Sequence, residues 1–285
     1  MSPAVAVVGL LVAPGAARSA SPPTAEVPRL ARVPSDLVLS ARLPTSASAE
    51  EDAMRGQIAE ANRRISECRE RFEQVQDYTC IFFKRERVRG TLTSQHVMRM
   101  KARTQPMSVY LKYVQPKPGR EGIFVAGKHR GRVLVHDVGI GKLLAGTLAV
   151  DPRSSFAMTD CRHPITEAGI GNLIHSIEDA WSKELSPANS VITIHTRARV
   201  GDRPCTMIES VHPDQELEFF YHMVKLYIDD ELGLPIRFEA YDWPKRPGAA
   251  PELIEEYIFG SLRLNVGLQD IDFDPTNTQY AFGRF

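Results

Sequence analysis

The sequence lacks both an excess of charge and a long apolar run. Its 285 residues contain 35 Lys and Arg against 35 Asp and Glu. Without a net positive field, nucleic acid is a poor candidate for a partner. No run reaches the roughly 18 apolar residues of a membrane-spanning helix, so we expect no transmembrane segment in the mature chain. The composition, 43% hydrophobic and 25% charged, is that of a globular protein with a sizeable core.

Cysteine is scarce, and no two cysteines form a CxxC pair. This spacing excludes the usual structural zinc sites and thioredoxin-like redox chemistry. Two interpretations stay open, namely one or two disulfides preserved in an oxidising compartment, and buried free thiols that pack as small apolar groups. The residues concerned are Cys68, Cys80, Cys161 and Cys205.

Catalytic and cofactor motifs are missing as well: there is no HExxH, no GxSxG and no complete GxGxxG. Cys161 and His163 are the nearest approach to a metal-ligand pair or a thiol with its base, but two ligands make no closed zinc site, and we favour a loop. For the acidic group 229–231, with Asp272 and Asp274, we favour a hairpin turn over a calcium or magnesium site. We therefore predict a non-enzymatic protein without cofactor or metal.

The first 49 residues do not have the pattern of a folded domain. Residues 4–13 are apolar and precede a small-residue cluster at 16–20. This resembles the core and cleavage site of a signal peptide, although no Lys or Arg comes before the apolar run. We predict a signal peptide over residues 1–20, a disordered linker rich in Pro, Ala and Ser over 21–49, and a periplasmic or otherwise exported protein.

A long amphipathic helix is the strongest local signal. Seven apolar residues recur at alternating intervals of four and three, which places them on one helical stripe, and the residues between them are mostly charged. Three heptads in a single segment favour packing on the helix's own domain over a coiled coil. The stripe consists of Met54, Ile58, Ala61, Ile65, Cys68, Phe72 and Val75.

After residue 77 the period changes to two, with Gly and Pro at short intervals, which predicts antiparallel strands. A second helix is expected over 166–185, with Thr166 as its N-cap. We read residues 50–285 as a single α+β domain in which these helices cover a large curved antiparallel sheet. The expected strands are 78–88, 96–102, 107–114, 121–126, 132–136, 190–200, 204–211, 219–228, 234–241 and 253–264.

A basic cluster lies on the first expected strand. It consists of Lys84, Arg85, Glu86 and Arg87, followed by Arg89. Charged side chains are rarely buried, so a solvent-facing strand surface is favoured. An anion-binding groove is the alternative.

Several short motifs resemble those of an uncharacterised bacterial family, domain of unknown function 1571. More distantly, a long first helix followed by a strand meander, and the hairpin 226–237, resemble the LolA-like and LolB-like periplasmic lipoprotein carriers. That resemblance implies a half-open β-barrel with helices across its mouth. The family motifs are Tyr78-Thr79-Cys80, Lys84-Arg85-Glu86, Gly90, Pro106, Gly119-Arg120-Glu121, His163-Pro164-Ile165-Thr166, Asp272-Phe273-Asp274-Pro275 and Tyr280.

The resemblance gives the apolar strand faces a use, because a curved sheet under helices can enclose a cavity for an acyl chain. The competing interpretation is that these side chains form plain core. Candidate cavity residues are Val109, Leu111, Tyr113, Leu226, Ile228 and Phe238.

Our leading hypothesis is an exported, monomeric, non-enzymatic protein that binds an apolar or acylated ligand, either a lipid or a lipoprotein. The alternative is an interaction or sensor module of the cell envelope without a small-molecule ligand. A hydrolase is the third and least favoured hypothesis.

Overall fold

The computed structural model describes residues 46–138, 146–215 and 219–283. Contacts divide the chain into two units, Met1–Leu43 and Pro44–Phe285, and every described residue belongs to the second. The predicted signal peptide and most of the predicted linker lie outside the described residues. Within this part of the chain, no helix is long and apolar enough to cross a membrane.

The described residues form one twelve-stranded sheet in which every pairing is antiparallel. The order is β7-β6-β5-β4-β3-β1-β12-β11-β10-β9-β8, and β2 pairs with β1 alone. The first half comprises β1 (Asp77–Val88), β2 (Thr91–Leu92), β3 (His96–Arg103), β4 (Ser108–Gln115), β5 (Glu121–Val125), β6 (Val133–His136) and β7 (Thr147–Val150). The second half comprises β8 (Val191–Val200), β9 (Arg203–Val211), β10 (Met223–Asp229), β11 (Pro235–Asp242) and β12 (Glu252–Leu264).

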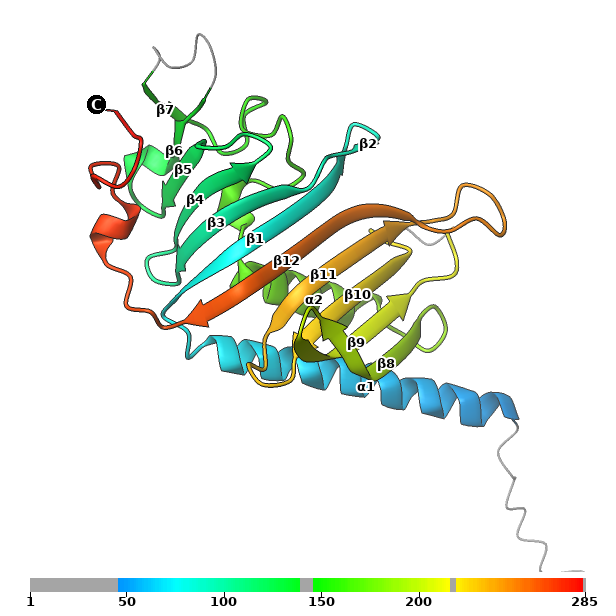
Figure 1. Ribbon diagram of the computed structural model, residues 1–285. Helices are drawn as coiled ribbons and strands as arrows, with labels where there is room; N and C mark the ends of the chain where they lie inside the picture. Colours follow the sequence, from blue (N-terminus) through cyan, green and yellow to red (C-terminus); the bar gives the residue numbers. More distant parts are fainter. Residues whose placement is uncertain (1–45, 139–145, 216–218, 284–285) are drawn as a thin grey trace, which may run out of the picture. The chain divides into compact units, whose positions relative to one another are not determined.

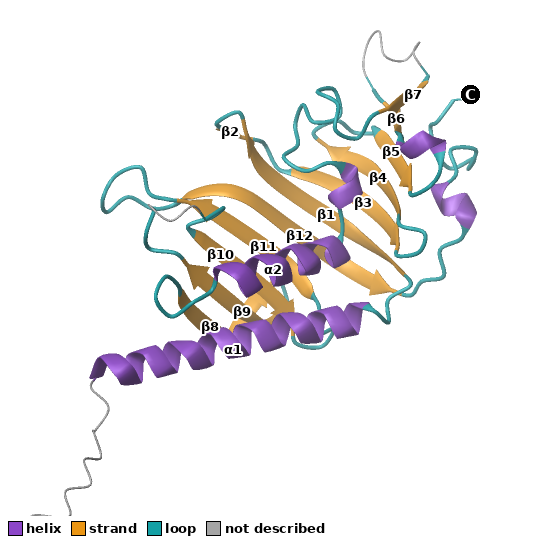
Figure 2. Cartoon of the chain, turned by 180° about the vertical axis from the view of Figure 1, so that it is seen from behind, coloured by secondary structure: helices purple, strands orange, loops and turns teal. Residues whose placement is uncertain are grey.

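Each half of the sheet is a meander, and β1 meets β12 in the middle. The sheet is curved and open, with β7 and β8 as its two edges (Figure 1). The helices α1 (Ser46–Phe72) and α2 (Ile170–Glu184) lie on one face of it (Figure 2). Short 3-10 turns cover His129–Gly131, Ile165–Glu167 and Asp270–Phe273. The predicted α+β fold, with a large curved sheet and two covering helices, is confirmed.

The apolar stripe of α1 packs on the domain as predicted. Ala61, Ile65 and Cys68 are at most 1% exposed and belong to the main core. Helix α1 also contacts α2, where Ser66 Oγ and Arg69 Nε both donate to the Glu178 carboxylate, at 3.1 and 3.2 Å. Intramolecular packing is therefore the correct interpretation of this stripe.

The start of α2 differs from the prediction. The helix begins at Ile170, so the proposed Thr166 cap is wrong; Thr166 lies in a separate 3-10 turn. Gly169, with φ of 113°, separates this turn from α2 and changes the direction of the chain between them. The buried hydroxyl of Tyr78 then accepts the Ile170 N–H at 3.0 Å. A tertiary contact thus provides the cap that was expected from a local hydroxyl.

The opposite face of β4–β6 carries a second, smaller core. Tyr110 alternates with Val109 and Leu111 along β4 and therefore points to the other side of the sheet. The segment after β12 returns across this face, where Phe273 and Phe282 are buried. The C-terminal segment closes the outer side of these strands and leaves the inner side for the helices.

Candidate functional site

A cavity of about 280 Å³ lies between α2 and the inner face of the sheet. Its roof includes Leu173, Ile177 and Trp181 of α2, and the segment 152–169 that leads into this helix forms another wall. No described residue of α1 lines the cavity. Helix α2 is therefore the lid, while α1 packs on the core beside it.

The floor of the cavity is centred on the β1–β12 seam. Residues two apart along a strand point to the same face. On both β1 and β12, aromatic and polar side chains therefore point into the cavity together. Phe82 stacks on Phe259 and Tyr257 with ring centroids 5.1 and 5.9 Å apart. Three directly opposed pairs belong to this floor: Phe82 with Phe259, Lys84 with Tyr257, and Glu86 with Glu255.

The pair Glu86 and Glu255 places two carboxylates opposite one another, an arrangement that destabilises a sheet unless it is compensated. Both side chains are buried. Lys84 Nζ lies 2.8 Å from Glu86, and the Tyr257 hydroxyl bridges the pair at 2.6 Å from Glu86 and 3.0 Å from Glu255. Glu86 also accepts the backbone N–H of Arg162 at 2.8 Å, so its compensation comes from the two strands and from the cavity wall.

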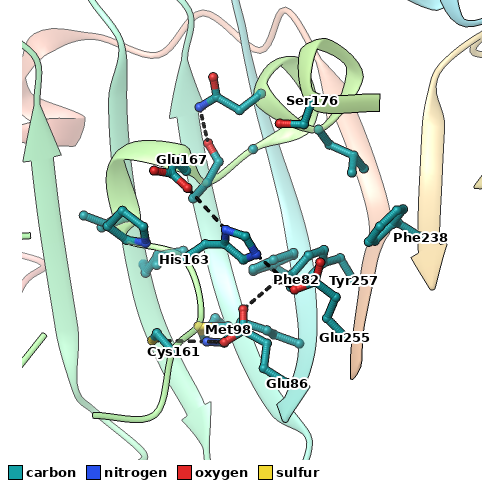
Figure 3. A pocket seen from close by; sticks show the side chains of 18 of the residues that line it. Phe82, Glu86, Met98, Cys161, His163, Glu167, Ser176, Phe238, Glu255 and Tyr257 are labelled. Atoms are coloured by element: carbon teal, nitrogen blue, oxygen red, sulfur yellow. Dashed lines mark hydrogen bonds and ion pairs between the residues drawn. The ribbon is translucent and has the colours of Figure 1, made fainter. Parts of the chain in front are cut away.

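Glu255 is compensated from the cavity wall and from the loop before β10. One of its oxygens accepts the Tyr221 hydroxyl. The other lies 3.0 Å from His163 Nε2 and 3.2 Å from Arg162 Nε. His163 Nδ1 in turn lies 3.2 Å from the Glu167 carboxylate (Figure 3). The wall segment is thus held to the floor through both carboxylates, Glu255 by the side chains of Arg162 and His163 and Glu86 by the Arg162 amide.

The protonation states follow from these contacts. Burial raises the pKa of Glu255, but His163, the Tyr221 hydroxyl and the Arg162 charge together outweigh burial and leave that pKa below its ordinary value. The hydrogen bond to Glu255 raises the pKa of His163, against an opposing effect of burial. Burial lowers the pKa of Lys84, yet the charge of Glu86 raises it overall. Each charged form is stabilised by its partners.

A second polar group lines the cavity at the C-terminal end of α2. It contains Glu184, Ser210 and His212. Burial raises the pKa of Glu184, and the nearby charge of Asp179 raises it further. Burial lowers the pKa of His212. His212 Nε2 lies 3.7 Å from the Glu184 carboxylate, too far for a hydrogen bond.

The six predicted cavity residues fall into two groups. Leu111, Tyr113 and Phe238 line the cavity. The other three do not line it and are buried in the main core: Val109, Leu226 and Ile228. Contact of any of the six with a ligand stays a prediction.

The other sequence candidates are accounted for by structural contacts. Cys161 lies 3.2 Å from Lys84 Nζ, whereas His163 contacts glutamates. Asp229 accepts two hydrogen bonds from Arg203 and two turn amides, and Asp272 pairs with Lys101. Across the described ranges, no group of three or more His, Cys, Asp or Glu could hold a metal ion.

All four cysteines are free. Cys68, Cys80 and Cys205 are buried, and burial raises the pKa of Cys68 to about 12 and that of Cys205 to about 11. The buried-thiol interpretation is therefore confirmed for these three. Cys161 is half-buried and lines the cavity.

The polar floor was missed from the sequence. The interpretation of the basic cluster as a solvated face is wrong for Lys84 and Glu86, which are 7% and 1% exposed. The signal was present, because both residues share the strand parity of Phe82. In the same way Glu255 shares the parity of Tyr257. The general preference of charged residues for the surface does not hold here, because the alternation places these side chains on the inner face of the sheet.

Comparison with protein families identifies the class. The family described as Protein of unknown function (DUF1571) matches residues 75–282, and the chain belongs to it. The search of curated proteins found no match.

Solved structures with a related architecture share little sequence with this chain. An uncharacterized conserved protein from Thermus thermophilus is 9% identical, covers 75% of this chain and 92% of its own, and has a TM-score of 0.41. The lipoprotein LppX of Mycobacterium tuberculosis is 9% identical, with 77% and 99% covered and a TM-score of 0.41. A LolA superfamily protein from Nitrosomonas europaea is 8% identical, with 75% and 97% covered and a TM-score of 0.29.

Proposed function

We propose that this protein binds an apolar or acylated ligand, a lipid or the acyl chain of a lipoprotein, in the cavity under α2. The observation that carries the proposal is the cavity itself, about 280 Å³ in volume and lined mostly by apolar and aromatic side chains beside its two polar groups. This volume is just below the roughly 300 to 1,000 Å³ of most small-molecule sites. It suits one alkyl chain or a ligand of similar size.

The energetics favour a chain with a largely apolar body. Burial of each methylene contributes about 0.8 kcal/mol. The stacked floor of Phe82, Tyr257 and Phe259 is rigid and adds little ordering cost on binding. Binding of this kind needs no catalytic group, in keeping with a non-enzymatic role. The signal-like pattern of residues 4–20 favours a role outside the cytoplasm.

The test is uptake of the neutral fluorophore N-phenyl-1-naphthylamine by the purified mature protein, with native mass spectrometry for co-purified lipid. We expect saturable binding that Ala180→Trp weakens at least tenfold, because Ala180 lines the cavity from α2. His175→Trp is the matched control, since His175 is an exposed residue of the same helix and does not line the cavity.

Two outcomes would contradict the proposal. One is equal affinity of the two tryptophan variants, which would locate the probe elsewhere. The other is the absence of both lipid and probe binding, which would favour the interaction module instead.

A further inference from the structure

The polar groups of the cavity indicate what kind of polar end its ligand carries. Cations that line the cavity are already paired with protein carboxylates. Lys84 lies 2.8 Å from Glu86, and Arg120 makes two hydrogen bonds of 2.8 Å to Asp137. His163 lies between Glu255 and Glu167. An entering anion would have to break one of these pairs and leave a buried carboxylate uncompensated.

Glu184 is different, because it lines the cavity without a close cation. Its side chain is 22% exposed, and the nearest basic atom in an ion-pair contact with it is His212 Nε2 at 3.7 Å. Burial and the charge of Asp179 raise the pKa of Glu184, and the opposing charge of Lys183 does not offset them. The carboxylate is available to accept a hydrogen bond from a ligand.

His212 cannot supply that hydrogen bond. Its Nδ1 lies 3.2 Å from both the Asn189 carbonyl oxygen and Ser190 Oγ. The carbonyl can only accept, and the Ser190 hydroxyl donates to Asn189 Oδ1 at 2.7 Å, so Nδ1 carries the proton. Burial lowers the pKa of His212 and keeps the ring neutral. Nε2 is then an acceptor, like the Glu184 carboxylate beside it. Two acceptors therefore line this end of the cavity, together with the Ser210 hydroxyl, which can accept as well as donate.

The helix adds to the same preference. Glu184 is the last residue of α2, and the C-terminal end of a helix carries partial negative charge that disfavours anions. At the other end of α2, where an anion would be favoured, the Ile170 amide is already taken by Tyr78. The C-terminal end of α2, where Glu184 lies, therefore works against a carboxylate or phosphate on the ligand.

We propose that Glu184 is a specificity-determining residue that selects ligands whose polar end donates hydrogen bonds, such as a hydroxyl or an ammonium group, over ligands with an anionic end. This inference rests on the proposed binding function and narrows its ligand class. Fatty acids and anionic phospholipid head groups fall outside that class.

The test compares three ligands with the same 12-carbon chain, 1-dodecanol, dodecylammonium and dodecanoate, by displacement of N-phenyl-1-naphthylamine from the mature protein. We expect the alcohol and the ammonium ligand to bind at least tenfold more tightly than dodecanoate. Glu184→Gln should weaken dodecylammonium at least fivefold, because it removes the charge, while 1-dodecanol changes less than twofold.

Glu70→Gln is the matched control, because it makes the same change at an exposed position of α1 that does not line the cavity. It should leave the order of the three ligands unchanged. Tight binding of dodecanoate, or an unchanged preference in Glu184→Gln, would overturn the inference alone. Failure of all three ligands and of the probe would instead overturn the proposed binding function, and the inference with it.

Discussion

At the scale of single residues, the cavity floor is defined by the opposed carboxylates Glu86 and Glu255. A like-charged, buried cross-strand pair is unfavourable by itself. The fold retains it by surrounding both groups with donors, among them Lys84, Tyr257 and His163. Unfavourable buried charge that a fold maintains with several partners is typical of a functional site.

Glu255→Gln tests how much this compensation matters. The change leaves Arg162 and His163 without their shared anion. Because these side chains are 35% and 43% exposed, water replaces part of the loss, and we expect about 1 to 3 kcal/mol of destabilisation. Urea unfolding measures it. Glu67→Gln is the control, because it breaks an exposed pair with Arg63, and it should change stability by less than about 0.5 kcal/mol. Equal effects of the two substitutions would mean that the buried cluster stabilises the fold no more than a surface ion pair does.

His163 makes the stability of the cluster depend on pH. Its pKa is raised in the folded state by the hydrogen bond to Glu255. A raised pKa means that the stabilisation is complete below the ordinary value of about 6.5 and is lost as pH rises through the folded value.

We therefore expect wild type to exceed His163→Gln in stability by more at pH 5.5 than at pH 9. Unfolding curves of the two proteins at both pH values measure the difference. His175→Gln is the control at an exposed position. A difference that is constant with pH would show that His163 acts by packing alone.

At the scale of elements, the alternation of apolar residues in strands and their spacing in helices predicted most of the fold. The ten expected strands are all present, and the stripe of α1 is buried, because these patterns report directly which side faces the core. Two strands were missed. β2 has only two residues, and β7 pairs with β6 at the edge of the sheet, so neither has a long alternating pattern.

The start of α2 shows why local signals were insufficient. Two conditions require glycine at position 169. Its φ is 113°, and the Tyr78 hydroxyl would lie only 2.7 Å from an added Cβ. Tyr78 precedes Ile170 by 92 residues, so no local pattern reveals it.

Gly169→Ala should therefore cost more than a substitution at a glycine that is only conformationally strained. Gly127 has φ of 80° with nothing within 4 Å of an added Cβ, and Gly127→Ala isolates the backbone cost of about 1 to 2 kcal/mol. We expect Gly169→Ala to exceed it by at least about 1 kcal/mol, since the clash also displaces the cap of α2. Thermal and urea unfolding compare the two. Equal costs would mean that the chain relaxes around Tyr78 freely.

At the scale of the whole molecule, the sequence predicted the layers and a cavity between them, but not which residues line that cavity. Periodicity predicts which face of a strand is covered by the helices. It does not predict whether the side chains fill all of the volume between the helices and the sheet. Leu111 and Val109 have the same parity on β4, but only Leu111 lines the cavity. The difference depends on where α2 lies, which is set by Tyr78, Gly169 and the wall segment together.

Substitutions on the two faces of the sheet should have different effects, on stability for the outer face and on ligand binding for the inner face. Tyr280 stacks on Tyr110 with ring centroids 4.1 Å apart, on the face away from α2. Tyr280→Ala removes this stack and exposes the smaller core, which we expect to destabilise the fold by about 2 to 4 kcal/mol.

Because neither ring lines the cavity, Tyr280→Ala should leave the affinity for N-phenyl-1-naphthylamine within twofold of wild type under conditions where the variant stays folded. Ala180→Trp should show the reverse, with weaker binding and little change in stability. If Tyr280→Ala weakened binding as strongly as Ala180→Trp, the outer core would have to set the shape of the cavity through the strands, and the separation of a supporting face from a binding face would be wrong.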